Sequence, residues 1–338
     1  MSPQQSPRSR QQGVALITVL LVVAVVAVLA VNMSGRLRGQ VDRAQAMEMA
    51  ENGYWYWLSA EALARRVLVT ELSADKFAHR GQNWARRQGP FPVEGGYIGG
   101  RIRDLHACFN LNALYPGSAD EPVVSASLAL EQYQALLRLL EFDRFTIEQL
   151  SATLVDWLDD DRVLVNPYGA EDADYESLPR PYQAANNMLS HISELRQVVG
   201  YTQAVYERIR PYVCVIPRRS ELAWNPNTID PEQPELLSAI FLGELSLEQA
   251  QSMLTSWPEN GYESVDDILS LAEIQGIVPE GDENVRGRES LSVESEFFEL
   301  RAAVKFGETD FFAVSILQIR GDESRVLHRS RRGYDWND

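Results

Sequence analysis

Histidine and cysteine, the residues that most often carry catalysis or bind transition metals, are scarce in this 338-residue sequence, which has four histidines and two cysteines. The histidines are His79, His106, His191 and His328. They are scattered, and none belongs to a His-Glu-x-x-His or triad-type motif. A Walker phosphate loop is also absent, since the run GGYIGG at 95–100 is better explained as turns flanking a strand. Catalysis therefore has little support.

Positive charge is also in short supply. Lys and Arg number 31 against 48 Asp and Glu, which gives a net charge of −17. Such a surface repels phosphate backbones and attracts cations, so a nucleic-acid partner is not expected and a divalent metal is plausible. Paired short helices such as LRQVVGYTQAVYERIRPYV could belong to a DNA-binding helix-hairpin-helix module, but basic flanks are missing and simple packing is the better explanation.

Proline is missing from Val14 to Gly89. Residues 14–31 are apolar except Thr18, which is long enough for a membrane span of ~20 residues. The sequence from 43 to 68 is dominated by good helix formers. We therefore predict one continuous helix of about 55 residues, ~80 Å long, with a membrane-embedded first half and an amphipathic second half.

The apolar run allows three interpretations. It could be a secretory signal cleaved after Val28-Leu29-Ala30, an uncleaved anchor, or a helix that packs against other helices of its kind. Arginines lie on both sides of the run, so charge alone does not fix its orientation.

Beyond the long helix the pattern predicts an α+β fold. Two short strands are expected within 95–114, and the segments EFFELRAAVKF and DFFAVSILQIR alternate apolar and polar residues around the hairpin signal GET. RVLHRSRRGY supplies a third strand of this group. Between these strand regions helices are predicted at 126–140, 146–158, 192–199, 203–213, 234–242, 247–256 and 265–274. The order predicts a small antiparallel sheet packed on the long helix, with a helical domain inserted in a sheet loop.

The densest polar cluster runs from Asp156 to Glu176 and holds eight carboxylates, with Asn166, Asn186 and Asn187 close by. These carboxylates belong to Asp156, Asp159, Asp160, Asp161, Glu171, Asp172, Asp174 and Glu176. Like charges at this density repel one another unless a cation lies among them, and calcium accepts oxygen ligands from irregular loops. The spacing is not that of an EF-hand, and a solvated acidic loop or a general acid and base are the alternatives.

The two cysteines, Cys108 and Cys214, lie in strand-like segments at the borders of the predicted insert. If the soluble part is exported, they could form one disulfide that ties the insert to the sheet. Two buried reduced thiols are the alternative.

The amino terminus resembles that of type IV pilins and pseudopilins, in which a polar leader ending in glycine precedes an uninterrupted apolar helix. The resemblance implies cleavage after Gly13 by a prepilin peptidase and a mature chain that begins at Val14, which is methylated. The fifth mature residue is usually glutamate, and here it is Thr18. That departure recurs in one branch, the K-type minor pseudopilins of type II secretion.

The helical block extends this resemblance over nearly the whole chain. FNLNALYPG, LVDWLDDD, GAEDADY, RPYQAANNMLSHISELRQVVG and WNPNTIDPEQPELLSAI are similar to the K-type insert, which has two helical subdomains of the sterile-alpha-motif kind. WNPNTIDPE departs from the more usual Asn-x-Asn-Thr-Ala. The implied domains are a leader at 1–13, a transmembrane part at 14–33, a pilin-like core at 34–115 and 286–338, and an insert at 116–285.

The resemblance implies a non-enzymatic subunit at the tip of the secretion pseudopilus, anchored once in the bacterial inner membrane with its soluble part in the periplasm. The implied partners are pseudopilins of the I and J types. The implied cofactor is calcium, and the implied ligands are Asp159, Asp161, Glu171, Asp172, Asp174 and Asn187. The alternatives are a single-span periplasmic calcium-binding protein with no fibre role and an exported hydrolase that uses the acidic cluster.

Overall fold

The computed structural model describes residues 12–117, 123, 126–278, 285–306 and 309–331. These belong to two units, residues 1–56 and residues 57–338. The predicted leader lies outside the described residues except at 12 and 13, and the predicted strand RVLHRSRRGY is described only as far as Arg331.

Helix α1 runs from Gln12 to Asp75 without a break. Its 64 residues exceed the predicted length of about 55. The helix continues through the turn-favouring pair Asn52-Gly53, and no proline interrupts the chain before Asp75. Every side chain from Val14 to Met33 is exposed, and this segment is long and apolar enough to cross a membrane.

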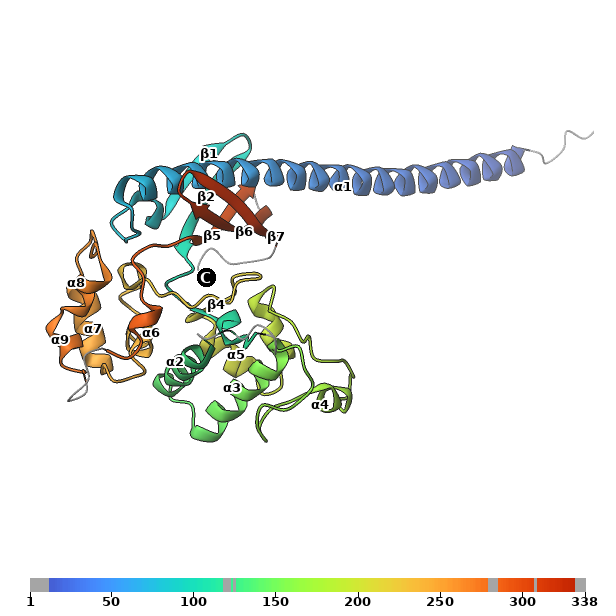
Figure 1. The fold of residues 1–338 in the computed structure, drawn as a ribbon. Coiled ribbons are helices and arrows are strands. Elements are labelled where there is room, and N and C mark those ends of the chain that lie inside the picture. Colours follow the sequence, from blue (N-terminus) through green and yellow to red (C-terminus); the bar gives the residue numbers. More distant parts are fainter. Residues whose placement is uncertain (1–11, 118–122, 124–125, 279–284, 307–308, 332–338) are drawn as a thin grey trace, which may run out of the picture. The chain divides into compact units, whose positions relative to one another are not determined.

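The second unit contains a five-stranded antiparallel sheet in the order β1-β2-β5-β6-β7 (Figure 1). The strands are β1 (Gln88–Val93), β2 (Gly96–Asp104), β5 (Phe297–Phe306), β6 (Thr309–Arg320) and β7 (Glu323–Arg331). The predicted antiparallel sheet is confirmed. The predictions missed β1, whose Pro90 and Pro92 argue against a central strand and are tolerated here because β1 lies at the sheet edge.

The last turns of α1 cover one face of the sheet. Ala64 and Leu68 pack against Phe298, Leu300 and Leu317, and all five residues are buried. Burying an aliphatic or aromatic side chain of this size contributes about 1.5–3 kcal/mol, so a few contacts suffice to hold the helix on the sheet.

A buried polar contact adds to this packing. Arg329 on β7 donates to both carboxylate oxygens of Glu61 on α1, at 2.7 and 2.8 Å. The Ser315 hydroxyl donates to the same carboxylate at 2.7 Å and accepts from the Trp57 indole N–H. Burial alone would raise the pKa of Glu61, but the hydrogen bonds from Arg329 and Ser315 outweigh it and lower that pKa. The carboxylate is therefore charged and fully paired.

The helical domain is inserted between β2 and β5, which are neighbours in the sheet. Its α-helices are α2 (Ala126–Leu139), α3 (Arg144–Leu158), α4 (Asp172–Glu176), α5 (Gln203–Ile209), α6 (Pro234–Ile240), α7 (Leu247–Ser256), α8 (Val265–Leu269) and α9 (Ala272–Gln275). Figure 1 shows α2, α3 and α5 in one group and α6 to α9 in another. One apolar core runs through both groups and includes Tyr133, Leu150 and Ile240.

Several predicted boundaries differ from the structure. Residues 192–197 form a 3₁₀ helix, and the single helix predicted at 265–274 is two short helices because the chain turns at Ser270. Of the two strands predicted in 95–114, the second is reduced to Phe109–Asn110, and a 3₁₀ turn follows because the Asn110 side chain caps it by accepting from the Asn112 N–H.

The insert and the sheet domain are connected by buried polar contacts. The Asn225 side-chain amide donates to the carbonyls of Ala78 and Val293 and to the Ser295 hydroxyl, over distances of 2.9 to 3.1 Å. Asn225 is fully buried, so its loss would leave the Ala78 carbonyl without this donor, whereas the Val293 carbonyl would still accept from the Ala78 N–H.

Candidate functional site

The acidic cluster lies in the loop between α3 and α4, and Asp156 shapes this loop. Its buried carboxylate accepts from the Val165 and Ala170 N–H groups, both at 2.9 Å. Gly169 permits this approach, because a Cβ there would lie 1.9 Å from the Asp156 carboxylate. The motif GAED thus begins with a residue that the fold requires.

Asp159, Asp161 and Glu171 form the cluster itself. One oxygen from each can be chosen so that all three lie within 4.8 Å of one another. Asp159 follows the last residue of α3, where the helix dipole disfavours negative charge, and Glu171 precedes the first residue of α4. Among the residues that the structure describes, no arginine or lysine forms an ion pair with these three carboxylates, since Arg162 pairs with Asp172 instead.

Three oxygens of the two buried carboxylates in the cluster have no hydrogen-bond donor among the described residues. One oxygen of Asp159 and both oxygens of Glu171 are buried without a hydrogen-bond partner among the described residues. Burial and the negative charges of neighbours such as Asp161 raise the pKa of Asp159 to about 7. Burial, followed by the charges of Asp156 and Asp161, raises the pKa of Glu171 to about 7 as well.

The other three predicted ligands make different contacts. Asp172 is ion-paired with Arg162 and accepts from the Ala184 N–H. The Asp174 carboxylate accepts from the Glu171 N–H. The Asn187 side chain accepts from the N–H of the next residue. The structure therefore brings together three of the six predicted ligands and holds the other three in local contacts.

We predicted Asn187 as the amide ligand, but it is the preceding residue, Asn186, that contacts Asp161. Its side-chain N–H₂ donates to the Asp161 carbonyl at 2.9 Å, and its own amide oxygen is buried without a donor among the residues that the structure describes. Its positive φ of 44° turns the chain sharply at this point. The run AANN at 184–187 indicates an amide ligand at this point of the chain, but it does not show which of its two asparagines is the ligand.

These oxygens fit a hard cation. Calcium takes ~6–8 oxygen ligands from carboxylates, amides and backbone carbonyls in flexible geometry. Three carboxylates and the Asn186 amide oxygen supply that chemistry, and a bound cation would remove both the repulsion and the missing hydrogen bonds.

The predicted processing site lies at the start of α1. Gly13 and Val14 are both helical, and the Thr18 hydroxyl donates to the carbonyls of Val14 at 3.2 Å and Ala15 at 2.9 Å. Thr18 thus satisfies its polar group within its own helix.

The two cysteines meet where the insert leaves the sheet. Strand β4 (Val213–Cys214) pairs in parallel with β3 (Phe109–Asn110), and Cys108 and Cys214 form a disulfide with their Cα atoms 5.8 Å apart. The bridge joins two residues with a sequence separation of 106, and the acidic cluster lies between them.

A membrane-length helix, an antiparallel sheet packed on its end and a helical domain inserted in that sheet define a pilin-like protein with a large insert. Two family models, each described as "Type II secretion system (T2SS), protein K", match residues 107–218 and 224–286 respectively. The chain belongs to this family and is a component of type II secretion.

Individual relatives agree with this assignment. The type II secretion system protein K of Aeromonas hydrophila is 37% identical over 94% of this chain and 96% of its own length. The protein K of Pectobacterium carotovorum is 35% identical over 97% of this chain and 98% of its own length. The crystal structure of the GspK-GspI-GspJ complex from enterotoxigenic Escherichia coli contains a chain similar to this one, with a TM-score of 0.75 and 30% identity. The match covers 86% of this chain and 100% of that chain.

Proposed function

We propose that this chain is a minor pseudopilin that caps the type II secretion pseudopilus and acts by assembly, without catalysing a reaction. The observation that carries the proposal is the similarity to a chain of the GspK-GspI-GspJ complex over most of its length. We infer that this chain joins I- and J-type pseudopilins of its own system, and that its single anchor lies in the inner membrane with the second unit in the periplasm.

Thr18 supports a place at the tip. In a fibre of this type, the glutamate at the fifth mature position compensates the charged amino terminus of a neighbouring subunit, and a subunit with nothing above it would bury that carboxylate without a partner. The Thr18 hydroxyl is satisfied by its own helix and needs no neighbour. The bulky insert would obstruct a further subunit.

Co-purification tests the assembly. The full chain is co-expressed with the I- and J-type pseudopilins and the prepilin peptidase of the same system, and isolated in detergent through a tag on the J-type subunit. We expect the three pseudopilins to elute together, and we expect mass spectrometry to find Val14 as the first residue of this chain. Elution of the chain alone would contradict the assembly, and an uncut Met1 or a start at Val31 would contradict the processing.

We further propose that the cluster of Asp159, Asp161 and Glu171 binds calcium, with Asn186 as an additional oxygen ligand. The buried oxygens without donors support this site. In this arrangement the cation would fasten the end of α3 to the start of α4. The role of the cation would be structural: it would fix the loop between the two helices, which carries the exposed residues Val163, Leu164 and Val165.

A further inference from the structure

A cavity of about 750 Å³ lies in the second unit between the sheet and the helical insert. It is lined by side chains that come from far apart in the sequence, and most of its charge is positive. The arginines at its wall are Arg80, Arg87, Arg101, Arg103, Arg210 and Arg301. Among the residues that the structure describes, three carboxylates line it, so this part of the wall carries an excess of three positive charges in a chain whose net charge is −17.

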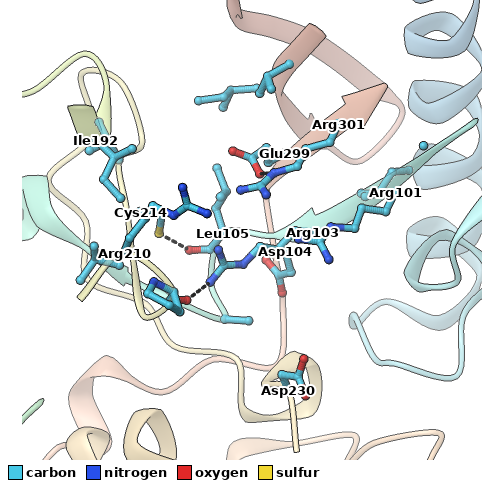
Figure 2. Close-up of a pocket in the computed structure, with 18 of the residues that line it drawn as sticks. Arg101, Arg103, Asp104, Leu105, Ile192, Arg210, Cys214, Asp230, Glu299 and Arg301 are labelled. Atoms are coloured by element: carbon cyan, nitrogen blue, oxygen red, sulfur yellow. Dashed lines mark hydrogen bonds and ion pairs between the residues drawn. The ribbon is translucent and has the colours of Figure 1, made fainter. Parts of the chain in front are cut away.

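Three of these arginines stand in a stripe on the sheet (Figure 2). Arg101 and Arg103 are two residues apart on β2 and so share one face about 7 Å apart, opposite the face on which Ile102 packs toward α1. Arg301 on β5 is the register partner of Arg101. Like charges directly opposite each other destabilise a sheet, so the fold tolerates a repulsion here.

The carboxylates at the wall neutralise this stripe only in part, and Glu299 is the one that faces it, as the register partner of Arg103. Glu299 pairs with Arg301, with its oxygen 2.5 Å from Arg301 Nε. Asp104 is buried and already accepts from the hydroxyls of Thr228 and Ser295. Partial desolvation, followed by the charge of Arg301, lowers the pKa of Arg101, and the carboxylates of Glu299 and Asp230 oppose that shift.

Arg101 and Arg103 differ in how they are held. Arg103 donates to the Pro211 carbonyl at 3.1 Å, which fixes its guanidinium at the edge of the insert (Figure 2). The Arg101 side chain makes no hydrogen bond or ion pair within the part of the chain that the structure describes, and the residue is exposed. A guanidinium has five N–H donors, and those of Arg101 are available to a ligand.

We propose that this cavity binds an extended acidic segment of a partner protein. The guanidinium group favours carboxylates through paired charge-assisted hydrogen bonds. In an extended peptide, alternate side chains repeat every ~7 Å, which matches the spacing of Arg101 and Arg103. The volume suits a ligand much larger than a single inorganic anion, and the buried apolar residues Val215 and Ile316 at the wall suit the intervening side chains. The proposal does not depend on the calcium site.

Fluorescence anisotropy with the full chain in detergent micelles tests this binding. The probe is a labelled short peptide in which glutamate alternates with serine. The control peptide is identical except that glutamine replaces each glutamate. We expect the glutamate peptide to bind and the glutamine peptide to bind at least tenfold more weakly. Binding of the glutamate peptide should weaken as salt is raised, because part of the site is exposed.

Two variants locate the site. Arg101→Gln should weaken glutamate-peptide binding about tenfold, because it removes the guanidinium most available to the ligand. Arg325→Gln is the matched control, since Arg325 lies on β7 outside the cavity and pairs with Glu323 on the surface. Equal binding of both peptides, equal binding by wild type and Arg101→Gln, or displacement of the peptide by low-millimolar inorganic phosphate at constant ionic strength would overturn the proposal.

Discussion

The second unit buries carboxylates in two ways, at Glu61 and at Glu171. Glu61 receives hydrogen bonds from Arg329 and Ser315, and its pKa is lowered. Glu171 is equally buried but meets further carboxylates, and its pKa is raised to about 7. The first carboxylate completes the contact between α1 and the sheet. The second is costly in the protein alone, which is why we assign its cluster to a cation and not to the stability of the fold.

Removal of the paired carboxylate of Glu61 should have the largest effect on the free energy of unfolding. Glu61→Ala should lower the free energy of unfolding by about 3 kcal/mol, because it removes the buried acceptor that the Arg329 guanidinium and the Ser315 hydroxyl share. Glu323→Ala is the control, since that carboxylate pairs with Arg325 at an exposed position and should change stability by less than about 0.5 kcal/mol. Chemical denaturation measures the free energy of unfolding of both variants. Equal losses of stability would show that the buried Glu61 pair contributes no more than the exposed Glu323–Arg325 pair.

Calcium should produce the next largest effect. At a free concentration 100 times its Kd, a ligand that binds only the folded state stabilises it by about 2.7 kcal/mol. We expect calcium to raise the thermal unfolding temperature of wild type and Glu61→Ala alike, and to leave that of Asp161→Asn nearly unchanged. A calcium-induced increase of the same size in Asp161→Asn would place the binding elsewhere.

Without calcium, the cluster should respond to pH in the opposite direction to Glu61. The pKa values of Asp159 and Glu171 are about 7 in the folded state and lie near their ordinary values in the unfolded chain, so the folded state binds more protons between about pH 4 and 7. Stability therefore falls as pH rises through this window. Glu171→Gln should stabilise the metal-free protein at pH 8 by the order of 1 kcal/mol, measured by denaturation in chelator. A loss of stability in this variant would show that the charged form is favoured.

The smallest effect is expected at Asp174, a predicted ligand that the structure holds in a local contact. Its carboxylate accepts from the Glu171 N–H and supports the start of α4. Asp174→Asn should change calcium affinity by less than about threefold, whereas Asp161→Asn should reduce it at least tenfold, because only Asp161 lies within the cluster. Calcium titrations of the two variants side by side decide whether the cluster is correctly delimited.

Local patterns predicted much of the fold. The absence of proline predicted α1, and alternation of apolar residues predicted β5 and β6. Prediction failed where distant contacts decide the structure. Strand β1 contains two prolines and is a strand because β2 pairs with it, which no local pattern reveals.

The acidic cluster and the arginine-lined cavity also differ in how far local sequence patterns could predict them. Dense acidic residues near Asp159 pointed to the loop, but only the path of the chain selects Asp161 and Glu171 over Asp172 and Asp174. The arginine-lined cavity gave no signal in the sequence, because Arg101 and Arg301 are separated by the whole insert and meet only through the pairing of β2 with β5.

The claim that the unpaired carboxylates form a cation site is tested most directly by isothermal titration calorimetry of calcium into the full chain in detergent at pH 7.5, with Glu171→Gln as the matched variant. We predict a saturable heat for the wild type that is lost or strongly weakened in Glu171→Gln. No heat at millimolar calcium, or the same isotherm for both proteins, would contradict the account.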